Sequence, residues 1–157
     1  MTQAERLPLP VLEDVRWIPL PQFRDSRGLL TAAEGMRDVP FPIARIFLLS
    51  DVPAGQERGA HAHYDTEQVA VAVRGSLQLE VSDGLRTSSF RLDDSARGLF
   101  LPRMIWNRLS DFTAEAVCLV MASTPYAPDR YLRTWAEFCA ARGVSAGRQT
   151  AREGTGR

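Results

Sequence analysis

The chain has 157 residues, of which 45% are hydrophobic, and its 19 basic and 19 acidic side chains give a formal net charge of zero. This length and hydrophobic content predict one domain with a substantial core. The balanced charge argues against a nucleic acid or an anionic membrane as a partner. Every basic side chain is arginine, so Schiff-base lysine chemistry is excluded and any anion must be bound by guanidinium groups.

The two ends of the chain carry little that could be buried. Residues 1–14 are mixed polar and proline-containing, which favours a loose arm, and the Gly, Ser, Arg and Thr-rich residues 143–157 are expected to be disordered. We therefore place the single domain at residues 1–142. No signal-peptide pattern and no apolar run of membrane-spanning length is present, so a cytoplasmic protein without membrane contact is expected.

Short apolar segments alternate with turn-forming residues from residue 15 to residue 122. Strands are expected at residues 15–20, 29–33, 43–49, 58–63, 69–73, 77–82, 87–92, 99–101 leading into 104–106, and 116–122. The main turns are expected at residues 23–28, 74–76, 83–84 (an Asp-Gly hairpin), 93–98 and 111–113. About nine or ten short strands with turns about every 8–12 residues predict an all-β jelly roll or barrel. Such a fold has an interior that can hold a small ligand.

Only the C-terminal region changes character. Residues 129–140 place apolar groups at helical spacing, with Asp129 as the expected N-cap, and we expect Tyr131, Trp135 and Phe138 to pack and anchor this helix. The two cysteines, Cys118 and Cys139, stand in an apolar run and in this helical segment, without metal-site spacing. Both are expected to be buried, unreactive thiols.

Both histidines of the chain lie one residue apart, in Arg58-Gly59-Ala60-His61-Ala62-His63. On a strand, residues i and i+2 face the same side, so the two imidazoles are expected to project together into the interior. Two close imidazoles can hold a metal ion or transfer protons. By the same alternation only one of Glu67 and Gln68 can share that interior.

The spacing Gly55-x5-His61-x-His63-x3-Glu67 resembles the first metal motif of the cupins, a jelly-roll family in which two His and a Glu bind a divalent metal. The second cupin motif supplies a further His, but Asn107 stands at that position here and the chain has no other histidine. Two histidines and one carboxylate could still form a facial triad on iron. A metal-dependent cupin enzyme is therefore one alternative.

A closer resemblance covers about residues 15–140. The segments that carry it are Asp25-x-Arg27-Gly28-x-Leu30, Arg58-Gly59-x-His61-Ala62-His63, Glu67-Gln68, Asp83-Gly84, Pro102-x-Met104-Ile105-Trp106, Asp111-Phe112, Ala122-Ser123-x-x-Tyr126 and Asp129-x-Tyr131-Leu132-Arg133. Together and in this order they resemble the sugar-nucleotide 3,4-ketoisomerase family of cupins. The resemblance implies a cupin-type jelly roll that moves the carbonyl of dTDP-4-keto-6-deoxyglucose from C4 to C3. It further implies no metal and no other cofactor, and a homodimer with an exchanged N-terminal strand.

The reaction assigns roles to the histidines. A ketone shift needs a base to remove the proton beside the carbonyl, donors that stabilise the enediolate and an acid that protonates the neighbouring carbon. An imidazole with a pKa of about 6.5 suits these transfers. We assign His61 as the base at C3 and His63 as its catalytic partner.

The remaining site residues are expected to bind the substrate. Guanidinium groups match phosphate oxygens, which suggests Arg27, Arg45 and Arg58 for the diphosphate. The resemblance favours Gln68 over Glu67 as the residue that faces the interior, where it suits the sugar or the base. Asn107 stands where relatives carry His or Arg, and with Arg27 it is expected to influence which face of C4 is protonated. A non-catalytic sugar-nucleotide-binding module is the second alternative, and the C4 configuration stays open.

Overall fold

The computed structural model describes residues 7–147, and strands dominate it. The strands are β1 (Arg16–Pro19), β2 (Gln22–Asp25), β3 (Gly28–Thr31), β4 (Arg45–Ser50), β5 (Arg58–His63), β6 (Gln68–Arg74), β7 (Leu77–Ser82), β8 (Thr87–Leu92), β9 (Arg97–Leu101), β10 (Trp106–Ser110), β11 (Val117–Ala122) and β12 (Tyr131–Leu132). The helical elements are η1 (Leu12–Asp14), η2 (Pro128–Arg130) and α1 (Trp135–Arg142).

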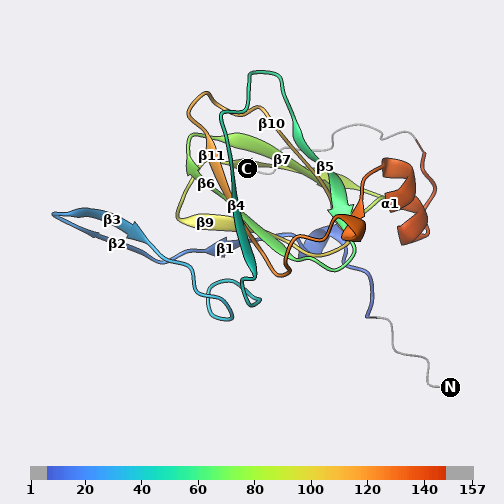
Figure 1. Ribbon diagram of the computed structural model, residues 1–157, viewed down its shortest axis with the longest axis horizontal. Coiled ribbons are helices and arrows are strands. Elements are labelled where there is room, and N and C mark those ends of the chain that lie inside the picture. The colour runs from blue at the N-terminus through green and yellow to red at the C-terminus, as the bar shows by residue number, and fades with distance from the viewer. Residues whose placement is uncertain (1–6, 148–157) are drawn as a thin grey trace.

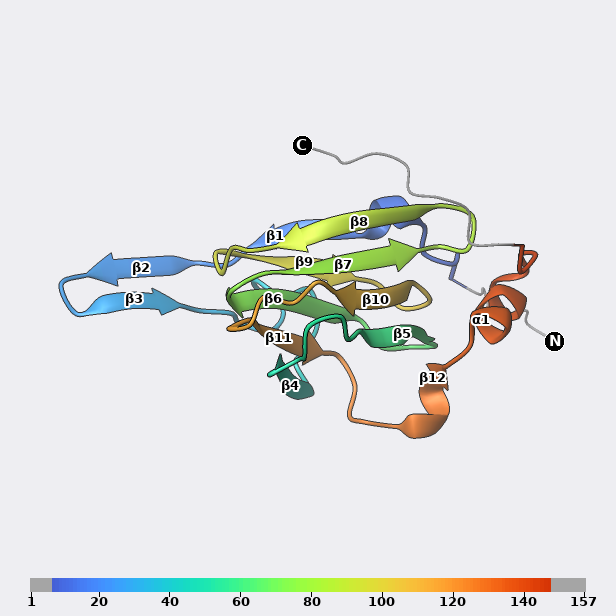
Figure 2. The same cartoon turned by 90° about the horizontal axis from the view of Figure 1, so that it is seen from above.

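Ten of the strands form two five-stranded sheets that pack face to face (Figures 1 and 2). The first sheet has the order β1-β9-β6-β11-β4 and the second the order β12-β5-β10-β7-β8. Neighbours within each sheet run antiparallel. Sequential strands such as β5 and β6 lie in different sheets, so the chain crosses repeatedly between the two layers. The expected all-β jelly roll with a short C-terminal helix is confirmed.

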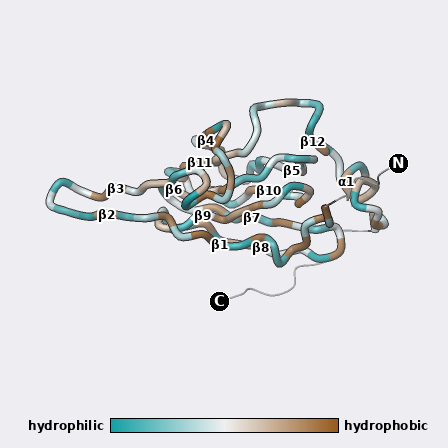
Figure 3. Tube along the Cα trace, turned by 90° about the horizontal axis from the view of Figure 1, so that it is seen from below, coloured by the Kyte–Doolittle hydropathy of each residue, from teal (hydrophilic) through white to brown (hydrophobic). Residues whose placement is uncertain are grey.

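The main hydrophobic core fills the space between the sheets. On β7 the alternating residues Leu77, Leu79 and Val81 are fully buried, as the two-residue period of the sequence predicted. They belong to one cluster with residues of β6, β9 and β11 in the opposite sheet. Full burial of such a side chain stabilises the fold by about 1.5–3 kcal/mol. Figure 3 shows the corresponding hydrophobic stretch along β9.

Both outer faces are covered in part by other segments. Val39 and Phe41, from the connection before β4, pack on Val69 and Phe100 at the outer face of the first sheet. Helix α1 places Phe138 and Cys139 in a cluster with Ala62 of β5, at one end of the second sheet. Cys118 lies in the core between the sheets, so both cysteines are buried and free, as expected.

Strands β2 and β3 form a hairpin that extends away from the two sheets (Figures 1 and 2). The turn expected over residues 23–28 is therefore too long, because Phe23 pairs with Leu30 and the turn proper is Ser26-Arg27. Pairing with β3 satisfies backbone groups that the sequence alone assigned to a turn. Phe23 and Leu30 are 64% and 58% exposed, which leaves the hairpin with an uncovered apolar pair.

The C-terminal helix starts later than expected. Thr134, not Asp129, is its N-cap: the Thr134 hydroxyl accepts from the Glu137 N–H, and the Glu137 carboxylate accepts from the Thr134 N–H. This reciprocal capping box satisfies two otherwise unpaired backbone donors. Asp129 instead lies in η2, and Tyr131 pairs with His63 as part of β12.

The helix ends at Gly143, which has the left-handed conformation typical of this position. Val144 follows and packs against the cluster around Phe138, so the segment expected to be disordered, residues 143–157, contains at least one packed residue. Residues 148–157, most of that segment, lie outside the described residues. Within residues 7–147 there is no helix long and apolar enough to cross a membrane.

Candidate active site

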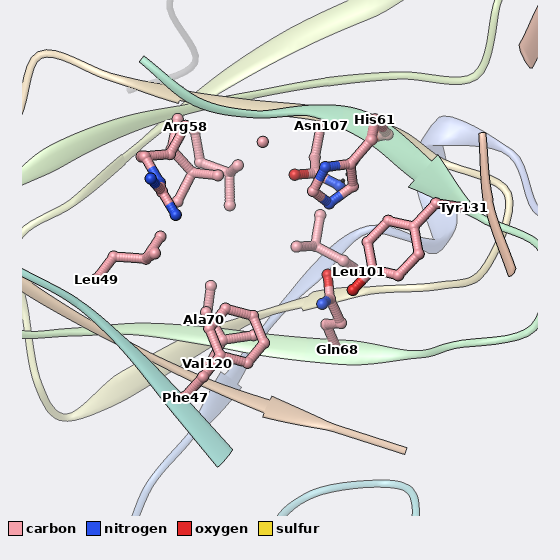
Figure 4. A pocket seen from close by; sticks show the side chains of 13 residues that line it. Phe47, Leu49, Arg58, His61, Gln68, Ala70, Leu101, Asn107, Val120 and Tyr131 are labelled. Carbon is pink, nitrogen blue, oxygen red and sulfur yellow. Dashed lines mark hydrogen bonds between the residues drawn. The ribbon is translucent and has the colours of Figure 1, made fainter. Parts of the chain in front are cut away.

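A cavity of about 190 Å³ lies between the two sheets (Figure 4). Both sheets contribute residues to its wall. Those of the first sheet are Phe47, Leu49, Gln68, Ala70, Leu101 and Val120, and those of the second are Arg58, Gly59, His61, Leu79, Asn107, Leu109 and Tyr131. Most of the wall is apolar, and its polar groups, apart from Arg58, lie near His61 (Figure 4). This combination is typical of a site for a small organic ligand.

Both histidines lie on the inner side of β5, as the period of the strand predicted. Their ring centroids are 5.0 Å apart and the rings are nearly perpendicular. His61 is half-buried and forms part of the cavity wall, whereas His63 is buried behind it. The Nε2 atom of His63 has no hydrogen-bond partner among the described residues. The two histidines are therefore adjacent but unequal, because only His61 faces the cavity.

A β-bulge before His61 sets its position. The register of β5 on β10 shifts between Asn107, which pairs with His61, and Arg108, which pairs with Gly59. The extra residue, Ala60, has a φ of 57° and Gly59 one of 79°. The amide of Asn107 donates to the His61 carbonyl at 3.2 Å across this irregularity. Bulges re-aim side chains next to active sites, and this one turns His61 into the cavity beside Asn107.

The surroundings of the histidines favour their neutral forms. Burial lowers the pKa of His61, and the positive charges of Arg133, Arg45 and Arg58 lower it further. Burial, together with the neighbouring His61 and Arg45, lowers the pKa of His63 to about 3. Near neutral pH both imidazoles are thus uncharged. A neutral His61 can accept a proton, whereas His63 is not able to act as an imidazolium acid.

Gln68, not Glu67, shares the interior with the histidines, as the family resemblance implied, and only one of the two does so, as alternation required. Gln68 is buried on β6 and belongs to the cavity wall, whereas the Glu67 backbone pairs with Ser123 at the strand end. Within the described part of the chain, no three or more His, Cys, Asp or Glu side chains come together in a way that could hold a metal ion. The carboxylate required by the metal hypothesis is therefore not assembled with the histidine pair.

The three predicted arginines lie in different places. Arg58 is on the cavity wall and partly exposed. Arg45 is not on the wall, but it lies over the rings of Phe47 and Tyr126, at 5.3 and 5.5 Å, close enough to lower the pKa of both histidines. Arg27 is at the tip of the β2–β3 hairpin, paired with Asp25 and outside this cavity. The structure thus brings His61, His63, Arg58, Gln68 and Asn107 together and leaves Arg27 apart.

The sequence analysis missed Tyr131 as a residue of the site. It was expected to pack in a helix, yet β12 places it on the cavity wall beside both histidines, with ring centroids 5.1 Å from His61 and 4.3 Å from His63. The signal that could have revealed this position is the Thr134-x-x-Glu137 capping box, which starts the helix after Tyr131.

A jelly roll with a histidine pair between its two sheets defines a cupin-type fold with a small-ligand cavity. Residues 13–143 match the family model described as "FdtA: WxcM-like, C-terminal", and the chain belongs to this family. Over 114 residues it is 36% identical to the TDP-4-oxo-6-deoxy-alpha-D-glucose-3,4-oxoisomerase of Aneurinibacillus thermoaerophilus, a match that covers 73% of this chain and 82% of that one.

Solved structures agree with this assignment. A 3,4-ketoisomerase from Helicobacter canadensis superimposes with a TM-score of 0.81 at 33% identity, covering 83% of this chain and 98% of its own. QdtA, a sugar 3,4-ketoisomerase from Thermoanaerobacterium thermosaccharolyticum in complex with TDP, gives a TM-score of 0.82 at 29% identity, with 85% and 97% covered. The WlaRB TDP-quinovose 3,4-ketoisomerase from Campylobacter jejuni gives 0.79 at 32% identity, with 82% and 99% covered.

Proposed function

We propose that this protein is a sugar-nucleotide 3,4-ketoisomerase that converts dTDP-4-keto-6-deoxyglucose to the dTDP-3-keto-6-deoxyhexose. The observation that carries the proposal is a neutral imidazole, His61, on the wall of a cavity whose other polar groups include Gln68, Asn107 and Arg58. Relatives at 29–36% identity bear the names of TDP-sugar ketoisomerases. The product would suit an enzyme that aminates a 3-keto sugar.

The chemistry follows from these groups. His61 removes the proton from C3, and the electron pair of that C–H bond forms the C3=C4 double bond while the C4 carbonyl becomes an enediolate oxygen. Amide donors of Gln68 and Asn107 are placed to stabilise the oxygen charge that develops. The intermediate collapses when C4 is protonated, the C3 hydroxyl loses its proton and the C4 oxygen gains one, which leaves a ketone at C3 and a hydroxyl at C4. His63 supports the position of His61.

Binding of the diphosphate is assigned to the arginines. Arg58 is on the cavity wall and partly exposed, so it can contact both the sugar site and an anionic group outside it. Arg45 adds positive charge near the histidines from its position over Phe47.

The active form is proposed to be a homodimer in which the N-terminal hairpins are exchanged. The β2–β3 hairpin exposes Phe23 and Leu30, and β4, at the edge of the first sheet, exposes Ile46 and Leu48. Such an uncovered hairpin and strand edge invite pairing between chains. In this arrangement Arg27, at the tip of the hairpin, would serve the partner's site.

The product of the reaction tests the proposal. The protein is incubated with dTDP-4-keto-6-deoxyglucose, and the carbonyl carbon is followed by ¹³C NMR. A carbonyl signal that moves from C4 to C3 supports the isomerase. Binding of the sugar nucleotide without any new carbonyl position would instead identify a binding module. Turnover that requires added Fe, Mn or Zn would instead support the alternative of a metal-dependent cupin enzyme.

A further inference from the structure

Isomerisation requires two proton transfers at carbon, and His61 is assigned to only one of them. The group that protonates C4 must reach the cavity and carry a proton near neutral pH. His63 does neither, because it lies behind His61 and its pKa of about 3 keeps it unprotonated. The residues that line the cavity include three titratable side chains, His61, Arg58 and Tyr131. Arginine holds its proton too tightly to serve as an acid, which leaves the tyrosine.

The geometry of Tyr131 suits this task. Its strand β12 pairs with the end of β5, in the register Tyr131 to His63, so the ring is held next to the histidine pair. The ring centroids of Tyr131 and His61 are 5.1 Å apart. In Figure 4 the Tyr131 hydroxyl points into the cavity, toward the Gln68 amide, with the His61 imidazole on the same side of the cavity. A sugar ring bound there would meet both groups.

Arg133 acts on both members of the proposed acid–base pair. Its guanidinium, two residues along the chain, lies 4.7 Å from the centroid of the Tyr131 ring, a cation–π contact that helps to hold the ring in place. The same cation lowers the pKa of His61 and keeps that imidazole ready to accept a proton. Arg133 thus positions the ring of the acid and favours the starting form of the base.

We propose that Tyr131 is the catalytic acid that protonates C4, with His61 as the base at C3; the assignment rests on the proposed ketoisomerase function. In this step the Tyr131 O–H bond breaks, and the electron pair of the C3=C4 bond forms the new C4–H bond. The C3 hydroxyl loses its proton as the C3 carbonyl forms. The phenolate and the C4 oxygen then take up the two protons that left C3 and its hydroxyl.

The test separates the two proton transfers in one variant. In D₂O, Tyr131→Phe should still exchange the C3 proton of dTDP-4-keto-6-deoxyglucose at close to the wild-type rate, because His61 is intact. Formation of the 3-keto sugar should fall by at least about 100-fold, the lower end of what a positioned acid contributes. Proton NMR at C3 and ¹³C NMR of the carbonyl measure the two rates in the same sample, and retained C3 exchange shows that the variant is folded.

Tyr126→Phe is the matched control. Its ring packs on Tyr131 at a centroid distance of 5.9 Å but is not part of the cavity wall, so removal of its hydroxyl should change neither rate. Equal losses of C3 exchange and product formation in Tyr131→Phe would overturn the proposal, since a structural role moves both. Normal product formation would overturn it as well. A wild-type protein that makes no 3-keto sugar would refute the ketoisomerase function itself and this assignment with it.

Discussion

The side-chain amide of Asn107 donates a hydrogen bond to the backbone carbonyl of His61, at 3.2 Å, across the point where the β5–β10 register shifts. Next to this contact, a Cβ atom on Gly59 would lie 2.9 Å from the Asn107 Oδ1 and 3.1 Å from the Asn107 carbonyl oxygen. Asn107, the bulge and Gly59 therefore form one unit that holds His61. Asn107 thus has a second task beyond the substrate contact that its sequence position suggested.

This unit predicts an unequal pair of glycine variants. Gly59 and Gly55 both have a φ of 79°, but no atom lies within 4 Å of a Cβ at Gly55. Gly55→Ala should cost about 1–2 kcal/mol for the left-handed backbone alone. Gly59→Ala should cost about 1–3 kcal/mol more because its methyl group collides with Asn107. Urea unfolding measures both; equal losses would show that Asn107 moves aside freely.

The acid limit of activity should lie below pH 6.5. The base His61 must be neutral to work, so kcat/KM falls as pH drops through its pKa, which burial and the charges of Arg133, Arg45 and Arg58 lower. Arg133→Gln removes one of these charges, so the pKa rises and the acid limb moves to higher pH. The pH profile of kcat/KM measures the shift.

Arg130→Gln is the control for that shift, because Arg130 is exposed and paired with Asp65 at 2.7 Å and does not act on His61. Its acid limb should coincide with that of the wild type. An acid limb that stays in place in Arg133→Gln would show that His61 is not the group that titrates.

Arg58→Ala should weaken the binding of dTDP by about 10- to 100-fold, the loss expected for a charge-assisted hydrogen bond of about 1.5–3 kcal/mol. Isothermal titration with dTDP measures it. Arg37→Ala is a suitable control, because Arg37 is exposed and pairs with Glu34, away from the cavity. An unchanged affinity in Arg58→Ala would remove this arginine from the diphosphate site.

The exchanged-hairpin dimer predicts that charges on the hairpin separate the two chains. Phe23→Glu with Leu30→Glu places two carboxylates at the exposed cross-strand pair, and light scattering should then report the mass of a monomer. Leu85→Glu serves as the control, since Leu85 is 77% exposed in the β7–β8 loop and should leave the dimer intact. A double variant that keeps the wild-type mass would exclude this interface.

Much of the site could be predicted from strand periodicity. The i, i+2 rule placed His61 and His63 on one face. Alternation admitted only one of Glu67 and Gln68 to the interior, and the family resemblance favoured Gln68, which the structure places on the cavity wall. Periodicity could not distinguish the half-buried His61 on the cavity wall from the buried His63, because that difference depends on how the sheets and β12 close around them.

The errors came from local patterns that tertiary pairing overrides. Residues 23–25 were assigned to a turn, but pairing with β3 makes them part of a strand. The apolar spacing of residues 131–138 suits a helix, and so it concealed the strand pairing of Tyr131 with His63. Arg27 could not be placed at this cavity, because the hairpin that carries it points away from it.

The most direct measurement follows deuterium from the solvent into the sugar, in wild type and in His61→Asn. The wild type in D₂O should yield a 3-keto sugar with deuterium at C4. His61→Asn should lose both C3 exchange and product by at least about 100-fold, with unchanged dTDP affinity. Turnover by His61→Asn near the wild-type rate would contradict the assignment of His61 as the base, and with it the mechanism proposed for this cavity.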